Sequence, residues 1–365
     1  SAAASRCRGR FVGSSCQVGR MATTSRFGCP LDNPDLMIAS LPAVLGFVPE
    51  KSLVLVTAAD GEMGAVLRID LPDGDTGPLF ELAEVAAVAE PDVAVAIIVD
   101  GEGAGCRMCA EDYREWTQLL TEELAERQVE LIAAYVVDVV DAVGRWYCAD
   151  GCGRSGRVAD PTASPLALAA VLDGRRLYAR RADLVAVVAP TDPERAAGLA
   201  ELLDKADGVE RCDIGSRIEF ALASAAQIAA GSALSDDDLV RLGTSLTHPQ
   251  VRDTLYALAV GDGAGPAESL WADLSRRLPG PWRAEALVLL AFSAYARGDG
   301  PLAGIALDAA LSCEPGHNMA GMLDQALRSG MRPEEIRDLA RTGYRIAAEL
   351  GIPLPPRRLF GRRAG

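Results

Sequence analysis

The stretch SLVLVTAADGEMGAVLRIDL, residues 52–71, decides the fold of the first half of the chain. Its opening segment, SLVLVT at 52–57, is a continuous apolar run of the kind found in buried strands. Gly61 lets the chain turn, and AVLRIDL at 65–71 has the composition of a second strand. The stretch therefore predicts a β-hairpin.

Strands and helices alternate on both sides of this hairpin. Two strand–helix–strand passes follow it, which favours parallel strands with helices packed on the sheet. We predict an α/β domain over residues 31–210, with a mixed, mostly parallel sheet. The expected elements are a short helix at 34–47, a helix at 77–90, a strand at 92–99, a helix at 111–128, a strand at 129–138 and a return strand at 143–148.

From about residue 194 onward the apolar periodicity is helical, and breaks rich in Gly, Pro or Asp separate the helices. Residues 211–350 are predicted to form an all-α, helical-repeat-like domain. Within it, 287–315 match the tetratricopeptide pattern, with Gly298 in the turn and Ala303 and Ala310 where two helices touch. Arg297 is expected on an exposed helix end. A peptide-binding groove and an ordinary helical bundle are both consistent with this pattern.

The two ends of the chain differ from the body. Residues 1–20 are rich in Arg, Ser and Gly, and we predict that 1–30 are a disordered or non-native N-terminal extension. Residues 351–365 form a basic tail rich in proline. Within this tail, Leu359-Phe360 lies between arginine pairs and is either a docking motif for an acidic partner or part of a solvated segment.

Net charge, hydropathy and cysteine content argue against several classes of function. The net charge of −15 argues against nucleic-acid binding by the folded body, because an acidic surface repels phosphate. Apolar runs are too short to cross a bilayer, so no membrane association is expected. Nine cysteines without a visible secretory signal predict mostly free thiols in the cytoplasm.

Five short strings carry a family resemblance. They are LPAVLGFVPEKSLV at 41–54, RIDLP at 68–72, GRWYC at 144–148 with Cys152 beyond, VRD at 251–253 and GDGPLA at 298–303. In this order, over roughly residues 31–330, they resemble an actinobacterial family known as domain of unknown function 4192. The resemblance implies no assigned activity. Family members often have a second cysteine beside the position of Cys152, where this chain has Gly153.

Two pairs of closely spaced cysteines are the most specific chemical feature of the sequence. Cys106 and Cys109 are spaced as C-x-x-C, and Cys148 and Cys152 as C-x-x-x-C, each pair next to glycines. Four thiolates in two close pairs can hold structural zinc. A redox or reversible disulfide role and ordinary free cysteines are the alternatives.

Polar residues of the family strings suggest a site at the edge of the α/β sheet. Arg68 and Asp70 face the same side of a strand, where they could anchor a ligand or bind each other. Trp146 beside Arg145 could stack on a ligand or partner, or cover the core. The candidate ligand or interaction residues are Phe47, Glu50, Ser52, Arg68, Asp70, Arg145 and Trp146.

The chain has two histidines and no recognised nucleophile or phosphate motif. We therefore predict a protein-interaction or regulatory module without catalytic activity, which binds a protein partner through its helical half or its basic tail. The alternative is an enzyme or small-molecule binder at the sheet edge, so whether the chain is an enzyme stays open. No cofactor is expected, apart from the zinc alternative at the cysteines.

Overall fold

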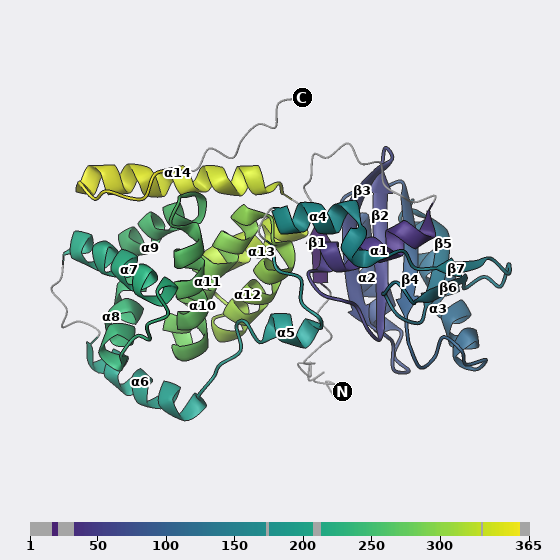
Figure 1. The fold of residues 1–365 in the computed structure, drawn as a ribbon, viewed down its shortest axis with the longest axis horizontal. Helices are drawn as coiled ribbons and strands as arrows, with labels where there is room; N and C mark the ends of the chain where they lie inside the picture. Colours follow the sequence, from purple (N-terminus) through teal and green to yellow (C-terminus); the bar gives the residue numbers. More distant parts are fainter. Residues whose placement is uncertain (1–16, 21–32, 173–174, 207–212, 330, 358–365) are drawn as a thin grey trace, which may run out of the picture.

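The computed structural model consists of a sheet-containing half and a helical half (Figure 1). It describes residues 17–20, 33–172, 175–206, 213–329 and 331–357. The strands are β1 (Gln17–Arg20), β2 (Ser52–Ala59), β3 (Glu62–Asp70), β4 (Val93–Val99), β5 (Glu130–Val137), β6 (Arg145–Cys148) and β7 (Ser155–Arg157).

Most helices belong to the second half of the chain. The α-helices are α1 (Pro34–Leu45), α2 (Gly77–Ala87), α3 (Cys109–Glu126), α4 (Pro165–Leu172), α5 (Arg181–Val185), α6 (Pro193–Ala206), α7 (Ile214–Ala229), α8 (Asp236–Leu246), α9 (Pro249–Leu255), α10 (Ala264–Arg277), α11 (Gly280–Arg297), α12 (Gly300–Cys313), α13 (Asn318–Arg328) and α14 (Pro333–Leu350). The 3-10 helices are η1 (Pro161–Ala163) and η2 (Tyr256–Val260).

The predicted hairpin is formed by β2 and β3. The two residues that join these strands, Asp60 and Gly61, have φ angles of 52° and 76°. Two-residue turns with positive φ at both positions match the twist of antiparallel strands, so this turn sets the register of the hairpin. The described strands form one sheet in the order β1-β3-β2-β4-β5-β6-β7.

The prediction of a mostly parallel sheet is wrong. Among the described strands, β4 and β5 form the one parallel pair, and every other neighbouring pair is antiparallel. The chain does make two strand–helix–strand passes, through α2 and through α3. The first pass carries the chain from β3 across β2, so β3 and β4 point the same way but are not neighbours. Both helical crossovers were correctly predicted, but the one through α3 joins neighbouring parallel strands and the one through α2 does not.

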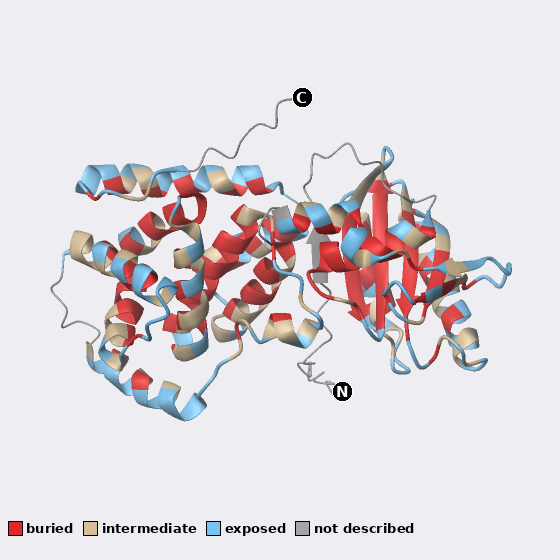
Figure 2. Ribbon diagram, in the orientation of Figure 1, coloured by how far each residue is buried: buried red, intermediate tan, exposed pale blue. Residues whose placement is uncertain are grey.

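The sheet is buried on both faces (Figure 2). Alternate residues of β2 divide between two apolar clusters, as the period of two requires. Leu53 and Leu55 pack with residues of α2 and α3, while Val54 and Val56 pack with residues of α1. The second of these clusters continues into the helical half, so both halves share apolar packing.

The string at 41–54 lies where the two halves meet. Gly46 ends α1 with a φ of 78°, in the left-handed region that glycine adopts without strain. A Cβ at Gly46 would lie 3.2 Å from the Pro301 side chain, at the start of α12. The strings at 41–54 and 298–303, far apart in sequence, are therefore in contact.

Helices α11 and α12 pack closely against each other. Gly298 caps α11 with a φ of 89°, and Ala303 and Ala310 are both 0 % exposed, as expected for contact positions. Arg297 was expected on an exposed helix end, and this expectation is wrong. Arg297 is half-buried, and its guanidinium forms ion pairs with Glu268 and Asp299. The likeness of this pair to a tetratricopeptide unit stays a prediction.

The terminal segments differ in part from what the sequence predicts. Residues 17–20, within the segment predicted to be disordered, form β1 and pair with β3. The rest of 1–30, apart from these residues, lies outside the described residues, as do Leu359 and Phe360. In the basic tail, Pro353 is exposed and Leu354 and Pro355 are half-buried, and all three line a groove of about 430 Å³ with residues of α7 and α10. The predicted domain boundary near residue 210 also falls outside the described residues. No helix in the described ranges has the length and apolar character needed to cross a membrane.

Candidate functional site

Asp100, directly after β4, is the centre of a polar network at the end of the parallel strand pair. The Asp100 side chain accepts hydrogen bonds from the backbone N–H groups of Glu102 and Gly103 and, at 2.8 Å, from the Tyr113 hydroxyl. Lys51 Nζ lies 3.1 Å from Asp100 Oδ1. Burial raises the pKa of Asp100, but these four donors outweigh it and hold the pKa below its usual value.

The glycines after β4 make this network sterically feasible. A Cβ at Gly103 would lie 2.0 Å from Tyr113 Oη and 2.4 Å from Asp100 Oδ2. Any side chain there would break the Asp100–Tyr113 hydrogen bond. The glycine-rich loop therefore lets the loop backbone approach Asp100 closely, and its amides bind a carboxylate of the protein itself.

The cysteines at 106 and 109 lie where this loop enters α3. Cys106 is in the turn that precedes the helix, and Cys109 is the first residue of α3. The sulfur of Cys106 accepts hydrogen bonds from the backbone N–H of Cys109, the thiol of Cys109 and the backbone N–H of Met108, which lower the pKa of Cys106. Both side chains are partly exposed, and neither cysteine is in a disulfide. The pair is therefore a reduced dithiol whose sulfur atoms are in contact.

The two thiols are electrostatically unequal. The hydrogen bond to Cys106 raises the pKa of Cys109, and the negative charge of Asp100 adds to this effect. Sequence reasoning missed Lys51, Asp100 and Tyr113 as neighbours of the dithiol. Lys51 had a detectable signal, because it lies in the family string at 41–54 and is one of only two lysines.

The second cysteine pair lies elsewhere. Cys148 ends β6, and the ligand atoms of Cys148, Asp150 and Cys152 lie within 4.8 Å of one another. Within the described ranges this group includes neither Cys106 nor Cys109. The described residues therefore do not bring the four cysteines of the predicted zinc site into one such group. Asp150, which sequence reasoning did not select, takes the third position.

Ser52, Arg68 and Asp70 lie together, as the strand register predicts. Arg68 is 4 % exposed, and its Nε donates to Ser52 Oγ at 2.8 Å. Its Nη2 donates to Asp70 Oδ1 at 2.5 Å. Phe47 is buried in the core, and Glu50 is exposed. The polar groups of this strip are thus largely directed at one another.

Trp146 is a packing residue at the far edge of the sheet. It is 6 % exposed, its Nε1 donates to Asp35 Oδ1 at 2.6 Å, and its ring meets Tyr135 edge-on. A Cβ at Gly156 would lie 2.7 Å from the Trp146 ring, so the ring covers this glycine. Arg145 is exposed. The seven candidate residues therefore do not converge on a single site.

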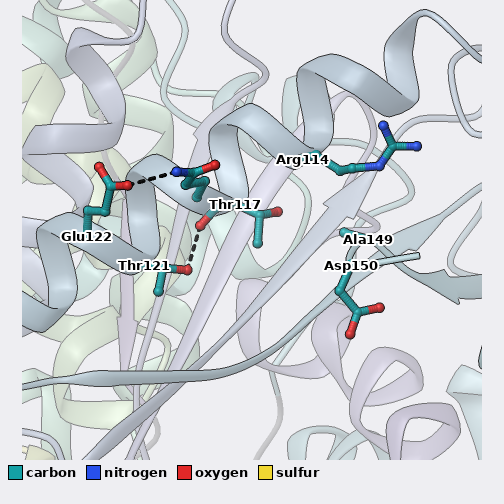
Figure 3. A pocket seen from close by; sticks show the side chains of 7 residues that line it. Arg114, Thr117, Thr121, Glu122, Ala149 and Asp150 are labelled. Atoms are coloured by element: carbon teal, nitrogen blue, oxygen red, sulfur yellow. Dashed lines mark hydrogen bonds between the residues drawn. The ribbon is translucent and has the colours of Figure 1, made fainter. Parts of the chain in front are cut away.

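A pocket of about 370 Å³ lies beside α3 (Figure 3). Several polar side chains of the pocket form hydrogen bonds within α3. Thr121 Oγ1 donates to the Thr117 carbonyl, and Gln118 Nε2 donates to Glu122 Oε1. Asp150 borders this pocket and also belongs to the cysteine cluster. The pocket is lined by Arg114, Thr117, Gln118, Thr121, Glu122, Ala149 and Asp150.

The string VRD at 251–253 supplies a charged network inside the helical half. Arg252 Nη1 donates to Glu285 Oε1 at 3.1 Å, and His317 Nε2 lies 3.3 Å from Glu285 Oε2. His317 also caps α13, where its Nδ1 accepts from the Ala320 backbone N–H. The Glu285 carboxylate raises the pKa of His317 above its usual value.

This shift predicts a pH-dependent contribution to stability. Because the folded-state pKa of His317 exceeds the unfolded value of about 6.5, the contribution is complete below that pH and is lost as pH rises through the folded-state pKa. We expect His317→Asn, which keeps a capping side chain, to cost more free energy of unfolding at about pH 6 than at about pH 9. Urea denaturation of both proteins at the two pH values measures this difference. A cost that is equal at both would contradict the prediction.

Comparison with known proteins gives a family but no activity. The profile of a family described as "Domain of unknown function (DUF4192)" matches residues 34–334. No curated protein and no solved structure shows a significant match to the chain. The matched region includes the Asp100 network, both cysteine pairs and the Arg252–Glu285–His317 network.

Proposed function

The chain belongs to the family described as a domain of unknown function (DUF4192), and from that premise we propose that it is a redox-responsive regulatory protein whose sensor is the Cys106–Cys109 dithiol. One observation carries the proposal. The Cys106 sulfur accepts two backbone N–H groups and the Cys109 thiol at the start of α3. Such donors stabilise a thiolate, which is the reactive form of cysteine.

The geometry supports an ordered two-step oxidation. The Cys106 thiolate attacks one sulfur of an oxidising disulfide, forms a mixed disulfide and releases one thiolate, which takes up a proton from water. Cys109 then loses its proton to water and attacks the Cys106 sulfur, which closes the intramolecular disulfide and releases the second thiol. The chain loses two electrons, and the oxidant is reduced to two thiols.

The hydrogen bond between the two thiols gives the cysteines different roles. It raises the pKa of Cys109, and the charge of Asp100 adds a smaller contribution, so Cys109 stays protonated while Cys106 is the thiolate. Cys106 is then the attacking residue, and Cys109 resolves the mixed disulfide. Oxidation changes the first turn of α3, four residues before Tyr113, which binds Asp100. The redox state is thereby coupled to the network that contains Lys51.

The proposal retains the interaction role and the cytoplasmic location expected from the sequence. In the cytoplasm, transient disulfides are usually catalytic or redox-sensing. A protein partner would detect the state of the dithiol. The alternative of a small-molecule site at the sheet edge has less support, because Ser52, Arg68 and Asp70 bind one another.

A trapping experiment tests the proposal. With oxidised glutathione, the wild-type chain is expected to form a disulfide between Cys106 and Cys109, and Cys109→Ser is expected to retain glutathione on Cys106. Cys106→Ser should do neither, because the attacking thiolate is gone. Peptide mass spectrometry of the full chain resolves each cysteine. Cys313→Ser, a partly buried cysteine in α12, serves as the matched control.

The pH dependence of alkylation provides an independent measurement. Because the pKa of Cys106 is lowered, its alkylation rate should reach half-maximum below the ordinary thiol value of 9.0. A midpoint at or above that value, or glutathione distributed over all exposed cysteines, would refute the sensor.

A further inference from the structure

The loop between β6 and β7 folds back so that its polar residues meet. The Cys148 backbone N–H donates to the Arg154 carbonyl at 3.0 Å, which closes the loop, and the Ala149 N–H donates to the Ala134 carbonyl of β5 at 2.9 Å. Gly151 and Gly153 have φ angles of 75° and 84°. This left-handed backbone, which other residues rarely adopt, brings Asp150 and Cys152 close to Cys148 at the end of β6.

Three metal-ligating side chains converge in this loop. The sulfur atoms of Cys148 and Cys152 and a carboxylate oxygen of Asp150 all lie within 4.8 Å of one another. In a tetrahedral zinc site, ligands at about 2.3 Å from the metal lie roughly 3.8 Å apart. The loop therefore needs only a small contraction to surround an ion. Cys148 is buried in the sheet, while Asp150 and Cys152 are exposed, and the Cys152 backbone N–H donates to Asp150 Oδ1 at 2.9 Å.

The chemistry of the three groups selects the metal. The group offers two cysteine sulfurs and one carboxylate oxygen, and binding of a divalent cation would displace the thiol protons. Soft sulfur ligands favour zinc over magnesium or calcium, which require oxygen ligands. We propose that Cys148, Asp150 and Cys152 bind one Zn²⁺, with solvent as the fourth ligand.

This site is distinct from the redox dithiol. Cys106 and Cys109 do not belong to the group, and they lie at the start of α3, not in the β6–β7 loop. Three protein ligands and one open position are typical of exchangeable or catalytic zinc, whereas a structural site has four protein ligands. The ion would therefore be accessible from solvent, beside the pocket that Asp150 borders.

Zinc titration of the full chain tests the proposal. The protein is reduced with a phosphine, freed of metal and titrated with Zn²⁺ against a chromophoric chelator. We expect one zinc per chain in the wild type, loss of binding in Cys152→Ser, and affinity weakened roughly tenfold or more in Asp150→Asn. Cys106→Ser and the control Cys313→Ser should bind zinc as the wild type does.

Cobalt substitution identifies the ligands directly. Co²⁺ bound to cysteine thiolates gives a charge-transfer absorption, which we expect in the wild type and in Asp150→Asn at higher metal concentration, but not in Cys152→Ser. Circular dichroism confirms that each variant is folded, which is expected because Cys152 is exposed. A reduced wild type that binds no zinc, equal affinity in Cys152→Ser, or loss of binding in Cys106→Ser would each overturn the proposal.

Discussion

Glu285→Ala is expected to lower the free energy of unfolding by about 3 kcal/mol. The Glu285 carboxylate lies between Arg252 Nη1 at 3.1 Å and His317 Nε2 at 3.3 Å. Its side chain is 11 % exposed, so water cannot replace it efficiently. Removing the carboxylate leaves the partly buried Arg252 guanidinium with the more exposed Asp253, 3.3 Å away, as its ion-pair partner, and this weaker compensation of a buried charge is the main cost.

The matched control is the same substitution in a surface ion pair. Glu334 in α14 lies 3.3 Å from Arg337 Nη1, and its side chain is 59 % exposed. Because exposed pairs contribute little, Glu334→Ala should cost under about 0.5 kcal/mol. Urea denaturation at neutral pH gives both values, provided that the dependence on urea concentration is unchanged. Equal losses in the two variants would show that the Arg252–Glu285–His317 network does not stabilise the helical half.

Local sequence patterns predicted the elements of the fold better than their order. Gly61 and the apolar run at 52–57 correctly predicted a hairpin, because turn geometry and strand burial depend on neighbouring residues. The order of strands depends on where α2 carries the chain, which no local pattern encodes. The mostly parallel sheet was therefore wrong. β1 was missed for a similar reason, because its pairing with β3 bridges about fifty residues.

The candidate site was predicted only in part. Strand periodicity placed Arg68 and Asp70 on one side, and they do bind each other. Trp146 was selected from a family string, but its hydrogen bond to Asp35 joins residues 111 positions apart and has no local signal. The same holds for Lys51 with Asp100. Spacing suggested both cysteine pairs, yet it could not show that Asp150, and not the other pair, lies beside Cys148 and Cys152.

Ala303→Leu is expected to cost about 1–3 kcal/mol, because it inserts three carbon atoms into the contact between α11 and α12. Ala303 is 0 % exposed, and Gly298 with its left-handed φ of 89° turns the chain tightly between these helices. They cannot separate freely, because α12 also packs on α13 and β1. Overpacking must then be absorbed by unfavourable side-chain conformations or backbone shifts.

Ala223→Leu in α7 is the control for this substitution. Arg297 cannot serve, because its ion pairs with Glu268 and Asp299 would be lost together with its charge. Ala223 is exposed in the middle of a helix, and alanine and leucine have similar helix propensities, so the change should cost under about 0.5 kcal/mol. Thermal unfolding of both variants compares a packed position with an open one. If the two midpoints agree, Ala303 is not at a close helix contact, and the register that places small residues at 303 and 310 must be abandoned.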